Sequence, residues 1–266
     1  MSNLNLKKMR KTTFIIGLLL MAGTMSFLHA QENKDAIFIA NDVSFTMKYV
    51  EGGSFKNING ETVKLNSFYI GQTEVTQELW EAVMGNNPSY FQEKKLKYMS
   101  VEFPDAPNSE RPVEQVSWND CQEFIAKLNS LTNAIFRLPL MNEWEYAALG
   151  GKNGLPIDRV NEINLQETAW TCDNSKLKTQ PVRYKAANEL GLYDILGNVM
   201  EWCQDDRIET NMITVTQEAY KVARGGSWNQ CFRSADTIKK MLKTTDQKHK
   251  QNCIGLRLVL TNPTDL

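Results

Sequence analysis

The segment from Gly191 to Asp205, GLYDILGNVMEWCQD, gathers the side chains best suited to bind a cation. It places three acidic residues, two glycines and a tryptophan close together. Each glycine would cost a helix interior about 1 kcal/mol relative to alanine, and the segment lacks the β-branched alternation of a strand. Carboxylates on a glycine-bearing turn suit hard cations such as Ca²⁺. We expect a turn-rich loop that holds an ion. The alternative is that Asp194 caps a turn and Glu201 accepts a surface hydrogen bond, with no ion bound.

The cysteines are the other candidate reactive groups: Cys121, Cys172, Cys203, Cys231 and Cys253. In an exported chain this odd number allows two disulfides and leaves at least one thiol unpaired. Cys172 and Cys203 both fall in loop-rich segments and are the first pair to expect. The cysteine spacing fits no zinc motif. The two histidines, His29 and His249, are too few for a multi-histidine metal centre and argue against a catalytic triad.

Residues 1–30 resemble a secretory signal peptide, and an uncleaved membrane anchor is the alternative. A basic patch precedes the apolar run from Phe14 to Met21, which is well short of the roughly 20 residues that span a bilayer. Small residues then lead to Ala30, without a cysteine for lipid attachment. We therefore expect a secreted, periplasmic or envelope protein, which contacts the membrane only through this peptide before cleavage.

The mature chain, residues 31–266, is expected to form a single domain because no proline- or glycine-rich linker and no repeat interrupts it. Removing the four basic residues of the leader leaves 26 Lys and Arg against 31 Asp and Glu, a net charge of −5. Nucleic acid is an improbable partner for such a chain, because phosphate binding requires a basic surface.

Three stretches have helical patterns. Thr76 is expected to cap a helix with Leu79, Trp80 and Val83 on its inner face, and Gly85 to end it. Ser117 and Asp120 have the spacing of a capping box. The apolar residues that follow recur with helical spacing, which places them in the core: Cys121, Phe124, Ile125 and Leu128. A third, shorter helix in RLPLMNEWEYAALGG is expected to end at Gly150-Gly151.

The remaining segments predict strands and loops. Alternating apolar residues indicate strands in four stretches: Ala36–Val50, Thr62–Ile70, Tyr220–Ser227 and Ile254–Leu260. Asn86–Pro112 is expected to be a surface loop or a lid, and Lys152–Asn188 to be mostly loop. Helices and strands without a βαβ rhythm predict an α+β fold with a high loop content.

Four stretches, taken together, resemble the sulfatase-modifying-factor family, which includes the formylglycine-generating enzymes. They are FYIGQTEVTQELWEAVMG, RLPLMNEWEYAA, GLYDILGNVMEW with CQD, and VARGGSW closed by IGLRLVL. Their order agrees with the family across Phe38 to Leu260. The resemblance implies an irregular, loop-rich α+β fold of the C-type-lectin-like, formylglycine-generating-enzyme type. It also implies a calcium site formed by Asp194, Gly197, Val199 and Glu201.

Known members of the family oxidise a client sulfatase cysteine to formylglycine with dioxygen and a copper ion held by two cysteines. Here only Cys231 follows Gly-Gly-Ser, and Asp236 stands five residues later. Cys253 could supply a second sulfur only if the fold brought it alongside. Ser227 of the oxygen pocket is kept, but Met200 replaces the family tryptophan. The resemblance therefore implies Cys231 and Ser227 as catalytic residues and copper as cofactor only if the protein is an active oxidase.

Two further residues have alternative roles in this comparison. Arg224 is a candidate clamp for an anionic ligand, or else a structural salt-bridge partner. Trp228 is a candidate ligand-binding surface, although it, like Trp118, Trp144 and Trp202, is more typical of a core. Cys231 is expected to be buried or in a disulfide, with a reactive thiol as the alternative. Leu140 occupies a position where the family usually has a helix-capping threonine.

The function expected from these features is an exported, non-oxidase family member that binds a peptide or glycan or takes part in envelope assembly. Its expected partner is a protein or peptide client or an envelope component. The alternative is an oxidoreductase that converts a client sulfatase cysteine to formylglycine through Cys231. A sugar-binding lectin is a third possibility that depends on analogy of fold alone.

Overall fold

The structure is a computed structural model that describes residues 34–92, 108–156, 158–159, 163–211, 216–231, 238–239 and 241–261. The chain from Lys34 to Leu266 forms one compact unit. None of the helices in the described part of the chain is long and apolar enough to cross a membrane. Asp236 lies outside the described residues, as does most of the expected loop or lid at Asn86–Pro112.

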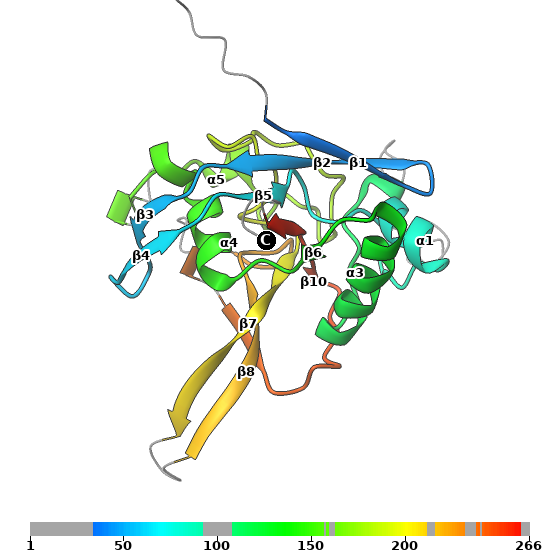
Figure 1. Cartoon of the computed structure of the whole chain (residues 1–266). Coiled ribbons are helices and arrows are strands. Elements are labelled where there is room, and N and C mark those ends of the chain that lie inside the picture. Colours follow the sequence, from blue (N-terminus) through cyan, green and yellow to red (C-terminus); the bar gives the residue numbers. More distant parts are fainter. Residues whose placement is uncertain are drawn as a thin grey trace, which may run out of the picture. The chain divides into compact units, whose positions relative to one another are not determined.

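A five-stranded antiparallel sheet joins strands from both ends of the domain (Figure 1). Its strands, in spatial order, are β1 (Ala36–Ala40), β2 (Val43–Val50), β5 (Phe68–Gly71), β11 (Val259–Thr261) and β6 (Phe136–Arg137). Asn41 and Asp42 form the turn between β1 and β2 and both have positive φ, a conformation that Asn and Asp tolerate better than other non-glycine residues. A separate hairpin consists of β3 (Gly53–Lys56) and β4 (Thr62–Leu65).

A second sheet contains the end of the acidic segment. Its order is β10 (Ile254–Gly255), β7 (Met200–Asn211), β8 (Thr216–Arg224) and β9 (Met241–Thr244). The outer parts of β7 and β8 extend away from the remaining elements in Figure 1. The prediction that all of Gly191–Asp205 is irregular is wrong at its C-terminal end, because Met200 begins β7. The register of β7 against β8 shifts between Trp202 and Asp206, and this irregularity obscures the strand pattern.

The expected strand Ile254–Leu260 is two short strands in different sheets. Ile254 pairs with Met200 in the second sheet, whereas Val259 pairs with Ile70 in the first. The chain changes sheets between them, and Arg257 lies in this connection with a fully buried side chain. A continuous apolar run therefore did not correspond to one continuous ladder of hydrogen bonds.

The three predicted helices form, and the described residues also contain a short helix within the stretch Lys152–Asn188 that was expected to be mostly loop. They are α1 (Gln77–Met84), α3 (Trp118–Thr132), α4 (Met141–Ala148) and the short α5 (Leu165–Thr168), with 3-10 turns η1 (Asn108–Glu110) and η2 (Gly151–Asn153). Thr76 caps α1 by accepting a hydrogen bond from the Leu79 amide, and Gly85 ends it with φ of 75°. Ser117 and Asp120 form the expected capping box of α3. The predicted inner face of α3 is buried, and Phe124 stacks on Trp80 with ring centroids 4.8 Å apart.

Helix α4 lacks a side-chain cap at Leu140. The Leu140 amide donates to the Glu143 carboxylate at 2.8 Å, but a leucine side chain cannot accept a hydrogen bond in return. Replacing Leu140 with threonine should therefore raise the free energy of unfolding by about 1 kcal/mol. Chemical denaturation measures this change, and Ser117→Ala, which removes an existing cap, should shift stability by a similar amount in the opposite direction. An unchanged midpoint in Leu140→Thr would contradict the prediction.

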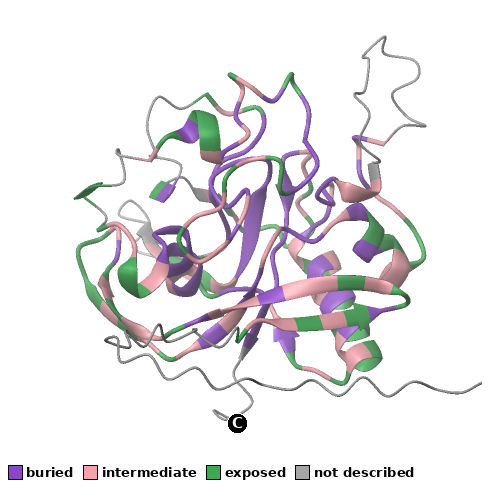
Figure 2. Ribbon diagram, turned by 90° about the horizontal axis from the view of Figure 1, so that it is seen from above, coloured by how far each residue is buried: buried purple, intermediate pink, exposed green. Residues whose placement is uncertain are grey.

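Figure 2 shows that buried positions continue into the irregular segments of the domain. Several charged side chains are also buried, and the largest fully buried side chains include Arg111, Arg224 and Arg257. Buried charges are unfavourable unless they are paired, so these residues mark the places where the fold depends on specific polar partners.

Candidate functional site

The acidic turn is held against the preceding loop by two of its own side chains. Asp194 accepts a hydrogen bond from the Arg183 amide through Oδ2 at 2.9 Å. Asn198 accepts from the Gln180 amide at 2.9 Å and donates to the Gln180 carbonyl at 3.0 Å. Gly197 is required here, because a Cβ would lie 2.5 Å from the Trp170 carbonyl oxygen. The turn is thus a close-packed structural element.

Glu201, the second acidic residue of the expected calcium site, is fully paired. Arg257 donates to its carboxylate through Nε at 3.0 Å to each oxygen and through Nη2 at 2.8 Å to Oε1. The Trp144 indole donates to Oε2 at 2.7 Å. All three side chains are buried. The alternative in which Glu201 accepts a surface hydrogen bond is therefore wrong.

Glu201 and the backbone next to Asp194 bind the same guanidinium group, that of Arg257. Nη2 of Arg257 donates to the Tyr193 carbonyl, next to Asp194, as well as to Glu201. Oδ1 of Asp194 is buried and has no hydrogen-bond partner among the described residues. Burial raises the pKa of Asp194 to about 6. Asp194 thus offers a free buried oxygen for a cation, whereas the Glu201 carboxylate already has a positive partner. Calcium binding by Asp194, Gly197, Val199 and Glu201 stays a prediction.

Glu74 and Arg257 are not among the site residues that the sequence predicts. Glu74 is 1% exposed, and neither of its carboxylate oxygens has a hydrogen-bond partner among the described residues. Burial, followed by the negative charge of Asp194, raises the pKa of Glu74 well above its usual range. The run IGLRLVL carried a signal for Arg257, because a single charge within an apolar run requires a buried partner. No comparable signal separates Glu74 from an ordinary acidic residue before a helix.

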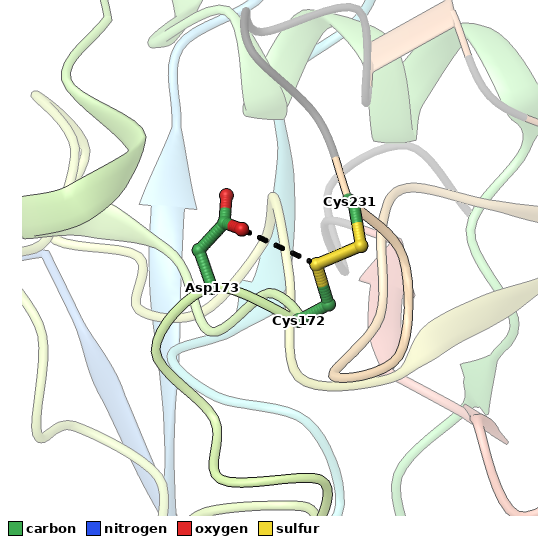
Figure 3. Close-up of side chains that lie close together, drawn as sticks. All are labelled: Cys172, Asp173 and Cys231. Carbon is green, nitrogen blue, oxygen red and sulfur yellow. Dashed lines mark hydrogen bonds between the residues drawn. A yellow bond between two sulfur atoms is a disulfide. The ribbon is translucent and has the colours of Figure 1, made fainter.

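The expected disulfide between Cys172 and Cys203 is wrong. Cys172 is bonded to Cys231, with Cα atoms 5.0 Å apart (Figure 3). The Cys172 amide donates to the Gln230 carbonyl at 3.1 Å, which brings the two loops together. Cys203 lies inside β7 and is buried. The expectation that Cys231 is either buried or disulfide-bonded is confirmed, because Cys231 forms a disulfide.

The disulfide lies near the surface. Cys231 is exposed and Cys172 is half-buried, and Oδ1 of Asp173 lies 3.4 Å from the Cys172 sulfur (Figure 3). Within the described ranges, these three residues are the one group of three His, Cys, Asp or Glu whose ligand atoms all lie within 4.8 Å of one another. From the sequence, Cys253 is the candidate for a second sulfur beside Cys231, whereas the fold supplies Cys172. Bonded to each other, the two sulfurs are not thiolate ligands.

The other three cysteines are buried thiols: Cys121, Cys203 and Cys253. Burial raises the pKa of each one. Cys253 donates a hydrogen bond to Gln251 Oε1 at 3.3 Å and does not approach Cys231 as a disulfide partner. Because the thiolate is the reactive form, none of these thiols is poised for nucleophilic or metal chemistry.

The residues beside the disulfide are packed into the core. Ser227 is fully buried and donates to Asn229 Oδ1 at 2.9 Å. Met200 is buried, and its sulfur accepts a weak hydrogen bond from Gln230 at 3.7 Å. Trp228 is 9% exposed, donates to the Asn252 carbonyl and packs edge-on against Phe91. Its contacts are those of a core residue, as are those of the fully buried Trp144 and Trp202. Trp118 is half-buried under the ammonium group of Lys221.

Arg224 is a structural salt-bridge partner, the second of its two expected roles. It is 2% exposed, and its Nη2 donates to Glu145 at 3.2 Å and to the Ile238 carbonyl at 2.8 Å. An anionic ligand would have to displace the buried carboxylate of Glu145 to reach this group. The contact ties β8 to α4 and to the residues after the disulfide.

A cavity of about 330 Å³ lies beside α1 and β2. Its lining includes one basic residue, Arg183, and four acidic residues: Asp42, Glu74, Glu78 and Glu110. The lining does not include Cys172, Cys231 or Ser227. The expected redox residues and this cavity are therefore separate features of the domain.

The comparisons with known proteins agree with this fold. A family model described as "Sulfatase-modifying factor enzyme 1-like domain" matches residues 30–262. The chain is 30% identical over 234 residues to "Chaperone protein LppX" of Paenibacillus barcinonensis, which covers 73% of this chain and 82% of that protein. It is 36% identical over 113 residues to "Formylglycine-generating enzyme" of Thermomonospora curvata, covering 38% of this chain and 35% of that enzyme.

The solved structure of Treponema denticola variable protein 1 superposes with a TM-score of 0.71 at 29% identity, over 86% of this chain and 99% of that one. The loop-rich α+β fold expected from the sequence is confirmed. Because the family model spans all of the described residues and the fold matches, this chain belongs to the sulfatase-modifying factor enzyme 1-like family.

Proposed function

We propose that this protein is an exported, non-oxidase family member that binds a protein or peptide client or an envelope component. The observation that carries the proposal is the state of the cysteines. The two surface cysteines are closed in a disulfide, and the other three are buried thiols with raised pKa values. A soft cuprous ion needs accessible thiolates, which the folded chain does not offer in this state.

Two further observations support a binding role. One relative that matches over 82% of its own length is named a chaperone protein, a name that implies a protein client for that relative. The match to a formylglycine-generating enzyme covers only 38% of this chain. Met200 also replaces the tryptophan of the oxygen pocket, and methionine is a flexible and oxidisable wall for such chemistry.

The exposed disulfide supports export. Disulfides at the surface persist in oxidising compartments and are rare in a reducing cytosol. This agrees with the signal peptide expected in residues 1–30. We infer a secreted, periplasmic or cell-envelope location, with membrane contact only through that peptide before its removal.

The proposal is tested with tagged, oxidised protein in two assays. Quantitative cross-linking in envelope extract should recover a specific client, which purified protein must then bind directly. In parallel, the protein should not oxidise a Cys-x-Pro-x-Arg peptide when copper and oxygen are supplied, and Cys231→Ser should behave identically. Failure to find any direct partner, or copper-dependent turnover of the peptide that Cys231→Ser abolishes, would contradict the proposal.

One observation favours a second candidate function, the oxidation of a client cysteine. The Cys172 sulfur is bonded to that of Cys231, so reduction would create two adjacent thiols beside Asp173 at the surface. Two thiolates at this spacing suit a soft metal ion such as cuprous copper. The distinguishing experiment reduces the protein before adding copper and peptide. Oxygen consumption that requires both Cys172 and Cys231 would establish the oxidoreductase instead.

A further inference from the structure

Strand β1 is an edge strand without the usual protection against pairing with another chain. It lies at the end of the five-stranded sheet and is hydrogen-bonded to β2 alone among the strands of the described residues (Figure 1). Its register runs without a bulge from Ala36 opposite Met47 to Ala40 opposite Val43. Its sequence, AIFIA, contains neither a charged residue nor a proline. Charges, prolines and bulges are what natural proteins use to keep an edge strand from pairing, and β1 has none of them.

The other edge strands of the described residues are protected. At the opposite edge of the same sheet, β6 has only two residues, and one of them is Arg137. The outer strand β9 of the second sheet contains Lys243, and β10 has two residues that are both buried. In the separate hairpin, β3 contains Lys56 and β4 contains Lys64. The open edge of β1 is therefore the exception in this fold.

The outer face of β1 is apolar. Ile37 is 72% exposed and Ile39 is 64% exposed. Successive side chains of a strand point to opposite faces. Phe38, between the two isoleucines, packs against Phe45 and Phe136 with ring centroids 5.8 and 5.0 Å apart. These aromatic contacts fix the inner face of β1, so both isoleucines are held toward solvent.

The backbone of the same two residues is also free to pair. The turn between β1 and β2 has two residues, so the flanking residues Ala40 and Val43 form a hydrogen-bonded pair. Bonded and non-bonded pairs alternate along an antiparallel ladder, which makes the pairs that Ile37 and Ile39 form with β2 non-bonded. Their N–H and C=O groups therefore point away from β2, toward the open edge. Ile37 and Ile39 thus offer backbone groups and apolar side chains at the same place.

We propose that β1 pairs antiparallel with β1 of a second copy of this chain, about a two-fold axis at Phe38, so that the two five-stranded sheets become one continuous sheet. In this register Ile37 lies opposite the partner's Ile39, and Ile39 lies opposite the partner's Ile37. Each of these two pairs exchanges both backbone hydrogen bonds of an antiparallel ladder. The isoleucines of both copies lie on one face, where their contact removes apolar surface from water. The contact is isologous, as in most protein dimers.

Charge complementarity selects this register. It places Lys34 opposite the partner's Asp42, and both residues are exposed in the single chain. Asp35, which lies between Lys34 and β1, is already paired with Lys48. Sliding one copy by two residues in either direction would set an isoleucine opposite Asp35 or Asn41, and would separate Lys34 from Asp42. Opposite charges that face each other across a ladder stabilise it, whereas these shifted registers lack that contact.

The interface is small. A single pair of five-residue strands is a limited contact beside the roughly 800 Å² per partner of a standard interface. We therefore expect a reversible dimer with a dissociation constant in the micromolar range, populated where the protein is concentrated.

Sedimentation equilibrium of the purified, oxidised protein over a series of concentrations measures the dimer directly. We expect a monomer–dimer equilibrium. Ile39→Lys should weaken it by at least about 10-fold, because each dimer would then hold two ammonium groups against isoleucines. Ile208→Lys is the matched control, since Ile208 is also a strand residue with 64% exposure but lies in β7, and it should dimerise like the wild type. Because both positions are exposed, neither lysine should change the melting temperature of the dilute protein.

Engineered cysteines test the register. An equal mixture of Ile37→Cys and Ile39→Cys proteins should form a disulfide-linked dimer on oxidation, since directly opposite residues have Cα atoms about 5.5 Å apart, within the range of a disulfide. Either variant alone should cross-link far less, because its two cysteines are diagonal to each other and too far apart. The native cysteines do not interfere, because two are bonded to each other and the other three are buried.

A charge reversal tests the contact between Lys34 and the partner's Asp42. Lys34→Glu sets like charges opposite each other and should weaken the dimer. Adding Asp42→Asn to Lys34→Glu should restore part of the affinity, and asparagine tolerates the positive φ of position 42.

Three results would overturn the proposal. A protein that stays monomeric up to millimolar concentration does not pair through β1. A dimer that Ile39→Lys leaves intact, or that Ile208→Lys weakens equally, is formed by another surface. Cross-linking of each cysteine variant alone as efficiently as of the mixture would exclude the register. None of these measurements depends on a client or on enzymatic activity, so their outcome is separate from that of the proposed function.

Discussion

Replacing Arg257 with methionine should lower the free energy of unfolding by about 3–5 kcal/mol, which is a large part of the stability of an ordinary domain. Arg257 is fully buried and bridges Glu201, Gly71 and Tyr193. The substitution would leave Glu201 buried without a cation, close to two further carboxylates. Denaturant unfolding followed by tryptophan fluorescence measures the loss, and a variant too unstable to purify is the extreme form of the same result.

Three variants separate the buried charge from a general packing effect. Arg257→Lys keeps the charge but not the planar fork, and should lie between wild type and Arg257→Met. Adding Glu201→Gln to Arg257→Met should restore part of the stability, because the unpaired charge is then absent. Arg207→Met breaks a partly exposed ion pair with Glu209 and should change stability far less. Equal stability of Arg257→Met and wild type would contradict the role given to this pair.

Removing the Cys172–Cys231 disulfide should destabilise the protein by up to about 4 kcal/mol. The bond closes a loop with a sequence separation of 59 residues. In the chain-entropy model, closing a loop of this length lowers the entropy of the unfolded chain and raises its free energy by about that amount. The double variant Cys172→Ala with Cys231→Ala measures the effect by denaturant unfolding under oxidising conditions.

The reductant response provides the control for this prediction. Adding dithiothreitol should lower the unfolding midpoint of the wild type toward that of the double variant. It should not change the double variant itself, because the three remaining cysteines are unpaired thiols. A wild-type midpoint that is insensitive to the reductant, with the bond shown to be reduced, would mean that the bond contributes little to stability.

The local elements of this fold could be predicted because their signals are local. Ser117 and Asp120 satisfy the first amides of α3 within one turn, and Cys121 to Leu128 follow its 3.6-residue period. The same reasoning located α1 through Thr76 and Gly85. Prediction failed where a segment changes sheets, as between Ile254 and Val259, since an apolar run contains no information about which neighbour each strand will have.

The cysteine pairing shows the same limit. Cys172 and Cys203 were chosen from their loop-rich surroundings, yet Cys203 lies in the interior of β7. The partner of Cys172 is set by hydrogen bonds between the 172 and 230 loops, which join residues far apart in the chain. Spacing along the sequence cannot determine such a pairing.

By itself, the sequence determined the family, the α+β class, the capped helices and the acidic turn with Asp194, because each of these follows from contiguous motifs and short-range periodicity. Only the tertiary structure decided that Cys172 joins Cys231, that Arg257 pairs with Glu201, and that the segment before α1 is hydrogen-bonded to the Asp194 turn. Each of these contacts connects segments that are more than 50 residues apart in the chain. The contribution of such contacts to the free energy of unfolding depends on burial and on a compensating charge. Both are properties of the folded chain.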